Sequence, residues 1–478
     1  MNRAAGVRAS RRAPPVLVGV ALASALWLSG CAGSRALDPR TARFPDVSFR
    51  PPPVAQSALS GGAPVFLLPD RDLPLVRLYA SFRGGSLYDP PDRAGLAEVA
   101  ALAWRTGGAG ALTPEAFDEA LEERAIELRL GFGRDTGWVT FSALPADLDR
   151  GLELLAALLA EPAFREERVT WAAGQMAERL RREVDSPQDL AFRELRRALY
   201  PGHPRGLIPT AATVGRVVRE DLLALHRRVV SEGAWAFGAV GDFEPQDLLA
   251  RLEERFGSLP SRGEGFAPVP PPAEPPPRTV LVPRPLPQTT LVWARLGPSR
   301  TAPEFHALDV ADHVLGSGGF QSLLVREIRS NRGLAYSVGS FYQALPTFGV
   351  LGMTASTRAE SAPQVLELLA TIPREAATSG LPAHHVAQAR EALVNRHVFR
   401  YEDPAALVRE RLGLLFDGLP ADLPARYVAG VQAVTAPGAS AAAEAFDLAA
   451  GVLVVVGDVD PADPAWGSRG PVLVVTAD

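Results

Sequence analysis

Short apolar runs and longer stretches with helical periodicity follow one another through most of the chain. Runs of alternating or continuous apolar residues predict strands, and apolar positions three and four residues apart predict helices. In the first half we expect strands near 64–69, 74–83, 135–144 and 235–241, and helices near 93–106, 113–128, 146–160, 165–184, 213–230 and 245–256. Strands and helices mixed in this way predict an α+β fold, with helices covering a largely antiparallel sheet.

The same pattern occurs a second time. Pro69 and Ala80 recur as Pro283 and Ala294, in similar apolar contexts and at an identical separation. Gly241 and Gly457 lie in two similar Val-Gly-Asp segments at nearly that same separation. A separation that holds near both ends predicts two copies of one domain rather than a short-period repeat. Helices of the second copy are expected around 303–315, 361–376 and 382–400.

A proline-rich stretch separates the two copies. Residues 258–278 contain seven prolines between Pro268 and Pro277, which favours an extended, semi-rigid spacer. The expected organisation is a signal peptide at 1–30, a tether at 31–57, an N-terminal domain at 58–257, a linker at 258–278 and a C-terminal domain at 279–478.

The amino terminus has the features of a targeting segment. Several arginines precede an apolar run from Val16 to Leu28, which is short for a membrane span. The run ends in Leu28-Ser29-Gly30-Cys31, which resembles a bacterial lipobox, and the alternative is a plain signal peptide or an anchor helix. The resemblance implies lipid attachment at Cys31, and Ala32 after it implies the periplasmic face of the outer membrane. Cys31 is the only cysteine, so the chain forms no internal disulfide.

Composition narrows the function classes. The 478 residues are 47% hydrophobic and 22% charged, which is typical of a folded protein. The net charge of −5 provides no basic field for nucleic acid. Fingerprints of a serine-hydrolase elbow, a phosphate-binding loop or a dinucleotide site do not occur.

The most informative stretch is Arg329-Ser-Asn-Arg332-Gly333-Leu-Ala-Tyr336-Ser-Val, preceded by the glycine loop 316–320. On residue types alone it is an ordinary helix-to-strand turn with solvated arginines. It resembles, however, the C-terminal half of insulinase-like metallopeptidases, the pitrilysin and mitochondrial processing peptidase type. That resemblance implies two homologous domains arranged as a clamshell. It also implies that Arg329 and Tyr336 hold a peptide substrate beside a zinc ion.

In that family a helix after the second strand carries His-x-x-Glu-His, whose histidines bind zinc and whose glutamate activates water. Here the equivalent positions hold Glu98, Ala101 and Leu102, and the third ligand position holds Arg179 with Glu178 beside it. The resemblance therefore implies a degenerate site without metal or catalysis. The seven histidines contain no His-x-x-x-His pair that could rebuild it. No cofactor is expected in this chain, and zinc is expected only in a catalytic partner.

Three functions remain open. The first is a non-catalytic, substrate-binding subunit of a heteromeric insulinase-like zinc metallopeptidase, acting on peptides or unfolded polypeptides with a catalytic partner chain. The second is a membrane-anchored scaffold or peptide-binding protein with no role in proteolysis. The third is an autonomous hydrolase with a different active site.

Overall fold

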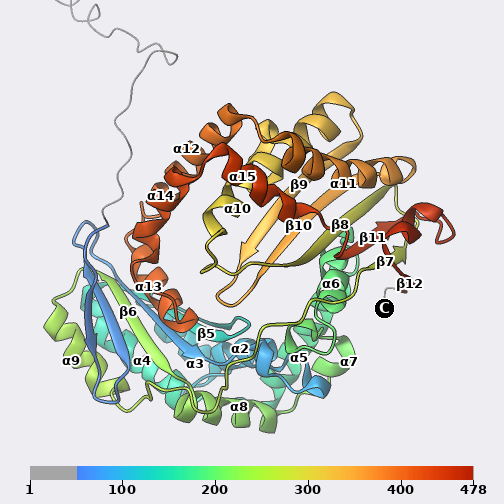
Figure 1. The fold of residues 1–478 in the computed structure, drawn as a ribbon. Coiled ribbons are helices and arrows are strands. Elements are labelled where there is room, and N and C mark those ends of the chain that lie inside the picture. The colour runs from blue at the N-terminus through green and yellow to red at the C-terminus, as the bar shows by residue number, and fades with distance from the viewer. Residues whose placement is uncertain (1–50, 477–478) are drawn as a thin grey trace, which may run out of the picture. The chain divides into compact units, whose positions relative to one another are not determined.

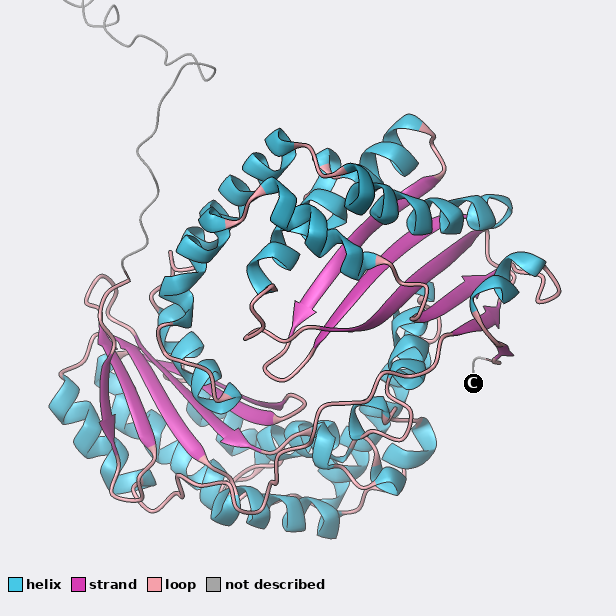
Figure 2. Ribbon diagram, viewed as in Figure 1, coloured by secondary structure: helices cyan, strands magenta, loops and turns pink. Residues whose placement is uncertain are grey.

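A computed structural model describes residues 51–476, which form two sheets of six strands each, with helices packed against them (Figures 1 and 2). The first half contains β1 (Ala55–Ala58), β2 (Pro64–Pro69), β3 (Val76–Arg83), α2 (Leu96–Thr106), α3 (Pro114–Glu122), β4 (Glu127–Phe132), β5 (Thr136–Ala143), α4 (Leu148–Ala160), α5 (Glu166–Glu183), α6 (Pro187–Leu199), α7 (Ala211–Val214), α8 (Arg219–Glu232), β6 (Trp235–Gly241) and α9 (Pro245–Phe256). The second half contains β7 (Arg278–Pro283), β8 (Gln288–Gly297), α10 (Phe305–Asp312), β9 (Ala335–Ala344), β10 (Gly349–Arg358), α11 (Ala362–Ser379), α12 (Ala383–Phe399), α13 (Ala405–Asp417), α14 (Leu423–Ala433), α15 (Ala436–Ala443), β11 (Val452–Gly457) and β12 (Val472–Val474).

The two sheets have equivalent strand orders. The first runs β1-β2-β6-β3-β5-β4 and the second β12-β7-β11-β8-β10-β9. In each, the first long strand pairs in parallel with the last, as β2 with β6 and β7 with β11, and the next three pairs are antiparallel. Only the outer edges differ, since β1 pairs antiparallel and β12 pairs parallel. The predicted α+β fold of two homologous copies is confirmed.

One helix of each half packs against the sheet of the other half. Helix α6 buries Leu190 and Leu195 against β8 and β11 of the second sheet. Helix α13 buries Val408 and Leu412 against β2 and β6 of the first sheet (Figure 1). A Cβ on Gly238 of β6 would lie 2.3 Å from Val408 Cγ1, so the close approach of α13 requires glycine at this position. The faces of the two sheets are therefore completed only when both halves are folded.

Two predicted helices were wrong in part. The helix expected over 213–230 is interrupted, because α7 ends at Val214 and α8 begins at Arg219. The helix expected over 113–128 begins as predicted, with Thr113 as N-cap and Pro114 at its first position, but ends at Glu122. Ala125 has φ of 51°, a left-handed conformation that stops a helix. Leu128 and Leu130 then alternate with exposed Glu127 and Arg129 to form β4. The prediction placed Ile126 and Leu128 in the helix, although the apolar residues from Ile126 to Leu130 have a period of two.

Within residues 51–476, no helix combines the length and the apolar character that crossing a membrane requires. The predicted lipid attachment site, Cys31, lies outside the described residues.

Candidate functional site

The Arg/Tyr segment is a helix-to-strand turn. The helix η7 (Val325–Asn331) ends where Gly333 takes a φ of 61°, which favours glycine. The Gly333 amide donates to the Arg329 carbonyl at 3.1 Å, and the Leu334 amide donates to the Ile328 carbonyl at 3.0 Å. The chain then reverses directly into edge strand β9, where Tyr336 is the second residue.

The turn brings Arg329 and Tyr336 together. The guanidinium carbon of Arg329 lies 5.8 Å from the centre of the Tyr336 ring and 5.1 Å from the centre of the Phe320 ring. Tyr336 is 74% exposed and Phe320 70%, so a cation and two rings stand at the surface. Arg329 makes no hydrogen bond or ion pair with any side chain in the described part of the chain. Phe320 was not predicted as a site residue, although its place after the glycine loop was visible in the sequence.

The degenerate zinc positions also meet in space. Glu98, Ala101 and Leu102 of α2 and Arg179 of α5 line one cavity of about 440 Å³, together with β4. Helix α2 packs directly on α5, which explains why positions far apart in the sequence face the same hollow. The four positions that were aligned from the sequence therefore line one cavity.

The residues of this cavity do not fit zinc. Among the described residues that line it, one carboxylate, on Glu98, faces the hollow, while Ala101 and Leu102 have no ligand atoms. Arg179 is itself a cation and donates a hydrogen bond to the Met176 sulfur at 2.6 Å. Glu178, the conceivable substitute ligand, is exposed and pairs with Arg181 at 2.6 Å. Across residues 51–476, histidine, cysteine and acidic side chains form no group of three that could hold a metal ion.

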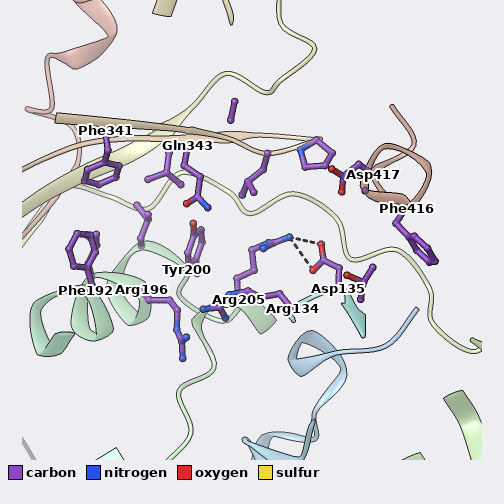
Figure 3. A pocket seen from close by; sticks show the side chains of 18 of the residues that line it. Arg134, Asp135, Phe192, Arg196, Tyr200, Arg205, Phe341, Gln343, Phe416 and Asp417 are labelled. Atoms are coloured by element: carbon purple, nitrogen blue, oxygen red, sulfur yellow. Dashed lines mark hydrogen bonds and ion pairs between the residues drawn. The ribbon is translucent and has the colours of Figure 1, made fainter. Parts of the chain in front are cut away.

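A larger hollow lies elsewhere, between α6, the β4–β5 turn, β9 and α13. It measures about 650 Å³ (Figure 3). Figure 3 shows Arg134, Arg196 and Arg205 on one side and Phe341 and Gln343 on the other. Arg205 pairs with Asp135 at 3.0 Å. No sequence pattern pointed to these arginines, because they are brought together only by the packing of α6 beside the turn.

Two of these arginines connect the large hollow to the degenerate site. Arg134 and Arg196 also line a smaller cavity of about 190 Å³, which Glu98 lines too. Burial, and then the charge of Arg134, lowers the pKa of Arg196 to about 10. Burial, and then the charge of Arg205, lowers the pKa of Arg134. Two guanidinium groups that lie close to each other therefore share a cavity with the carboxylate of Glu98, and they make that side of the degenerate site positively charged.

The chain is similar to several known proteins. Residues 216–393 match a family model described as the peptidase M16 inactive domain. An uncharacterised zinc protease of Mycobacterium tuberculosis is 28% identical over 277 residues, which cover 56% of this chain and 62% of the relative, so this chain spans less than two thirds of its length. A non-peptidase homologue of Helicobacter pylori is 24% identical over 363 residues, covering 75% of this chain and 83% of the homologue. The crystal structure of a peptidase M16 inactive domain from Pseudomonas fluorescens has a TM-score of 0.77 and 25% identity, and covers 85% of this chain and 98% of that one.

Proposed function

We propose that this chain is a non-catalytic member of the insulinase-like (M16) peptidase family and the substrate-binding subunit of a heteromeric zinc metallopeptidase. The observation that carries the proposal is a contrast between two places in the chain. At the positions of the family's general base and second zinc-binding histidine, Ala101 and Leu102 have side chains that can neither bind a metal nor transfer a proton. At the Arg/Tyr turn, Arg329 and Tyr336 stand together at the surface.

The exposed pair suits a peptide backbone. Arg329 can donate charge-assisted hydrogen bonds to a peptide carbonyl or carboxylate. The Tyr336 hydroxyl can donate to a substrate carbonyl oxygen on which negative charge develops, and a zinc ion held by a partner chain would supply the activated water. Both side chains can meet a substrate at little cost, because neither must first break an ion pair within the described residues.

The amino-terminal segment extends the proposal to location. Lipidation at Cys31 would hold the subunit, and through it the complex, at the periplasmic face of the outer membrane. The arrangement would keep a peptidase that lacks its own anchor at the membrane surface.

The test is association followed by turnover. The tagged chain is purified from its own host, and the co-purifying proteins are identified. We expect an insulinase-like chain with an intact His-x-x-Glu-His motif. The cleavage of a fluorogenic peptide is then measured for that partner alone and with this chain added, and the complex should be at least about tenfold faster.

Two results would contradict the proposal in different ways. A partner that is equally active alone would reduce this chain to the scaffold or peptide-binding protein of the second interpretation. Peptide cleavage by this chain alone, abolished by a chelator, would instead favour an autonomous hydrolase.

A further inference from the structure

The second half contains a cavity of its own, of about 290 Å³, between α10, β9, α12 and α14. Its place matches that of the degenerate zinc cavity, which lies between α2, β4 and α5 in the first half. The match holds at individual residues. Met176 of α5 corresponds to Leu393 of α12, and Arg179 corresponds to Arg396, because the separation in the sequence is the same for both pairs. The duplication has therefore produced two equivalent hollows with different linings.

The lining of the second cavity is rich in positive charge. Arg300, Arg396 and Arg400 border it, and Asp309 is the one acidic residue among the described residues that line it. Asp309 is already engaged, since it accepts a hydrogen bond from the Tyr427 hydroxyl. Arg400 lies 3.9 Å from Glu410, outside the cavity.

Arg300 and Arg396 are the cations that remain available. Within residues 51–476 neither guanidinium has a hydrogen-bond or ion-pair partner. Their charges reach the same space. Burial, then the charge of Arg400, and more weakly that of Arg300 lower the pKa of His397 to about 4. Burial raises the pKa of the nearby Tyr427, and the charge of Arg396 opposes that rise. His397 is thus neutral at neutral pH, so the positive charge of the cavity comes from the arginines.

Flat rings form the rest of the wall. The rings of His397 and Tyr427 are stacked, with centroids 4.6 Å apart and an interplanar angle of 28°. Phe305 contacts both His306 and Tyr427, with centroids 5.0 and 6.2 Å apart. Asp309, three residues after His306, was not predicted as a site residue, although the spacing places both on one helix face. Arginine forks beside flat rings suit a carboxylate attached to a planar apolar group.

We propose that this cavity binds the carboxylate of the C-terminal residue of a peptide, with preference for an aromatic or other flat side chain. The arginines Arg300 and Arg396 would hold the carboxylate, and the rings of Phe305 and Tyr427 would contact the side chain. Ala344 lines both this cavity and the large hollow described above, so the two spaces are neighbours. The peptide source of the ligand rests on the proposed function, whereas the recognition of a carboxylate does not.

The test uses small probes and the purified full-length chain without any partner. N-acetyl-phenylalanine and its amide are titrated by ligand-observed NMR at constant ionic strength. We expect the acid to bind at least about tenfold more tightly than the amide, because charge-assisted bonds to the carboxylate are lost in the amide. The double variant Arg300→Ala/Arg396→Ala should bind both probes equally weakly, and Arg396→Lys should fall between, since lysine keeps the charge but not the fork.

The matched control is Arg179→Ala, which removes the equivalent arginine from the first-half cavity and should leave the preference for the acid unchanged. Equal binding of acid and amide by the unaltered chain overturns the proposal. So does a preference that survives in the double variant. Inorganic phosphate that displaces the acid and binds more tightly than it would assign the cavity to a small inorganic anion instead. A negative result here leaves the subunit role intact, because that role is tested by co-purification and turnover.

Discussion

Replacing Arg329 by alanine and Tyr336 by phenylalanine separates a role in substrate binding from a role in folding. Arg329→Ala removes the guanidinium but leaves the turn, because the hydrogen bonds donated by the Gly333 and Leu334 amides join backbone atoms. Tyr336→Phe removes one hydroxyl and keeps the ring that Arg329 contacts. We expect both variants to fold normally and both to slow a reconstituted two-chain peptidase.

The magnitudes follow from the contacts. Arg329 lies over two exposed rings, and an exposed cation–π contact contributes about 0.5–1 kcal/mol. Arg329→Ala should therefore lower the free energy of unfolding by at most about 2 kcal/mol, and Tyr336→Phe by less than about 0.5 kcal/mol. With substrate bound, each variant loses a hydrogen bond that involves charge, which contributes about 1.5–3 kcal/mol. The expected fall in kcat/KM is about ten- to a hundredfold.

Denaturant unfolding and peptide-cleavage rates of the same samples provide the answer. Arg332→Ala is the matched control, because Arg332 is also exposed and lies three residues further along the same turn. It should change neither quantity. Full turnover with both Arg329 and Tyr336 replaced would refute the substrate-binding role. A loss of stability well above the expected bound in Arg329→Ala would show instead that the arginine supports the fold.

Four further predictions test other parts of the structure. The purified full-length chain should contain no stoichiometric zinc and cleave no peptide, because the residues of its zinc cavity do not fit the metal; one zinc per chain by metal analysis, with chelator-sensitive activity, contradicts this. Cys31→Ser should leave the chain folded but absent from the membrane fraction, and quantitative recovery with outer membranes would place the anchor elsewhere. Leu190→Ala should lower the free energy of unfolding by about 2–5 kcal/mol, because Leu190 is buried under the second sheet, whereas exposed Gln188→Ala should not. Burial raises the pKa of Asp312 to about 6 from an ordinary 3.8. Between these values the folded chain keeps a proton that the unfolded chain has released, so the free energy of unfolding should fall as pH rises from about 4 to 6. Asp312→Asn keeps an acceptor for the Ser340 hydroxyl, and its free energy of unfolding should rise relative to that of the unaltered chain as pH increases across that window. Parallel pH curves of the two free energies would disprove the assignment.

The sequence predicted the duplicated strands well because they are marked by period and by offset. Val65 to Pro69 and Val280 to Pro283 are apolar runs at a fixed separation, and both form long inner strands. The missed elements have mixed signals. β4 follows a helix with no glycine or proline between them, and only the left-handed Ala125 marks the break. Helix α6 was not predicted at all, although Ser186 is a clear N-cap. Its apolar face packs against a sheet that lies in the other half of the chain.

The candidate sites divide in the same way. The Arg329 and Tyr336 pair and the four degenerate zinc positions could be named as candidates, because each set belongs to a motif whose residues lie close in the sequence or on adjacent helices. The structure places the members of each set near one another, and their roles stay predictions. The arginines around the large hollow could not be found, because Arg134 and Arg196 come from different elements and lie in no motif. Single arginines are common in this chain, and only tertiary packing distinguishes those that converge.

Helices α6 and α13, each of which packs against the sheet of the other half, connect the fold to the proposed function. Leu195 and Leu199 of α6 bury apolar surface on the second sheet, and both also line the large hollow. Leu412 and Phe416 of α13 do the same for the first sheet. Because the hollow is walled by helices that each half contributes to the other, its shape depends on the two halves being folded together. A half produced alone would expose the apolar sheet face that the missing helix covers. We therefore expect any ligand of this hollow to bind the whole duplicated chain and neither half alone.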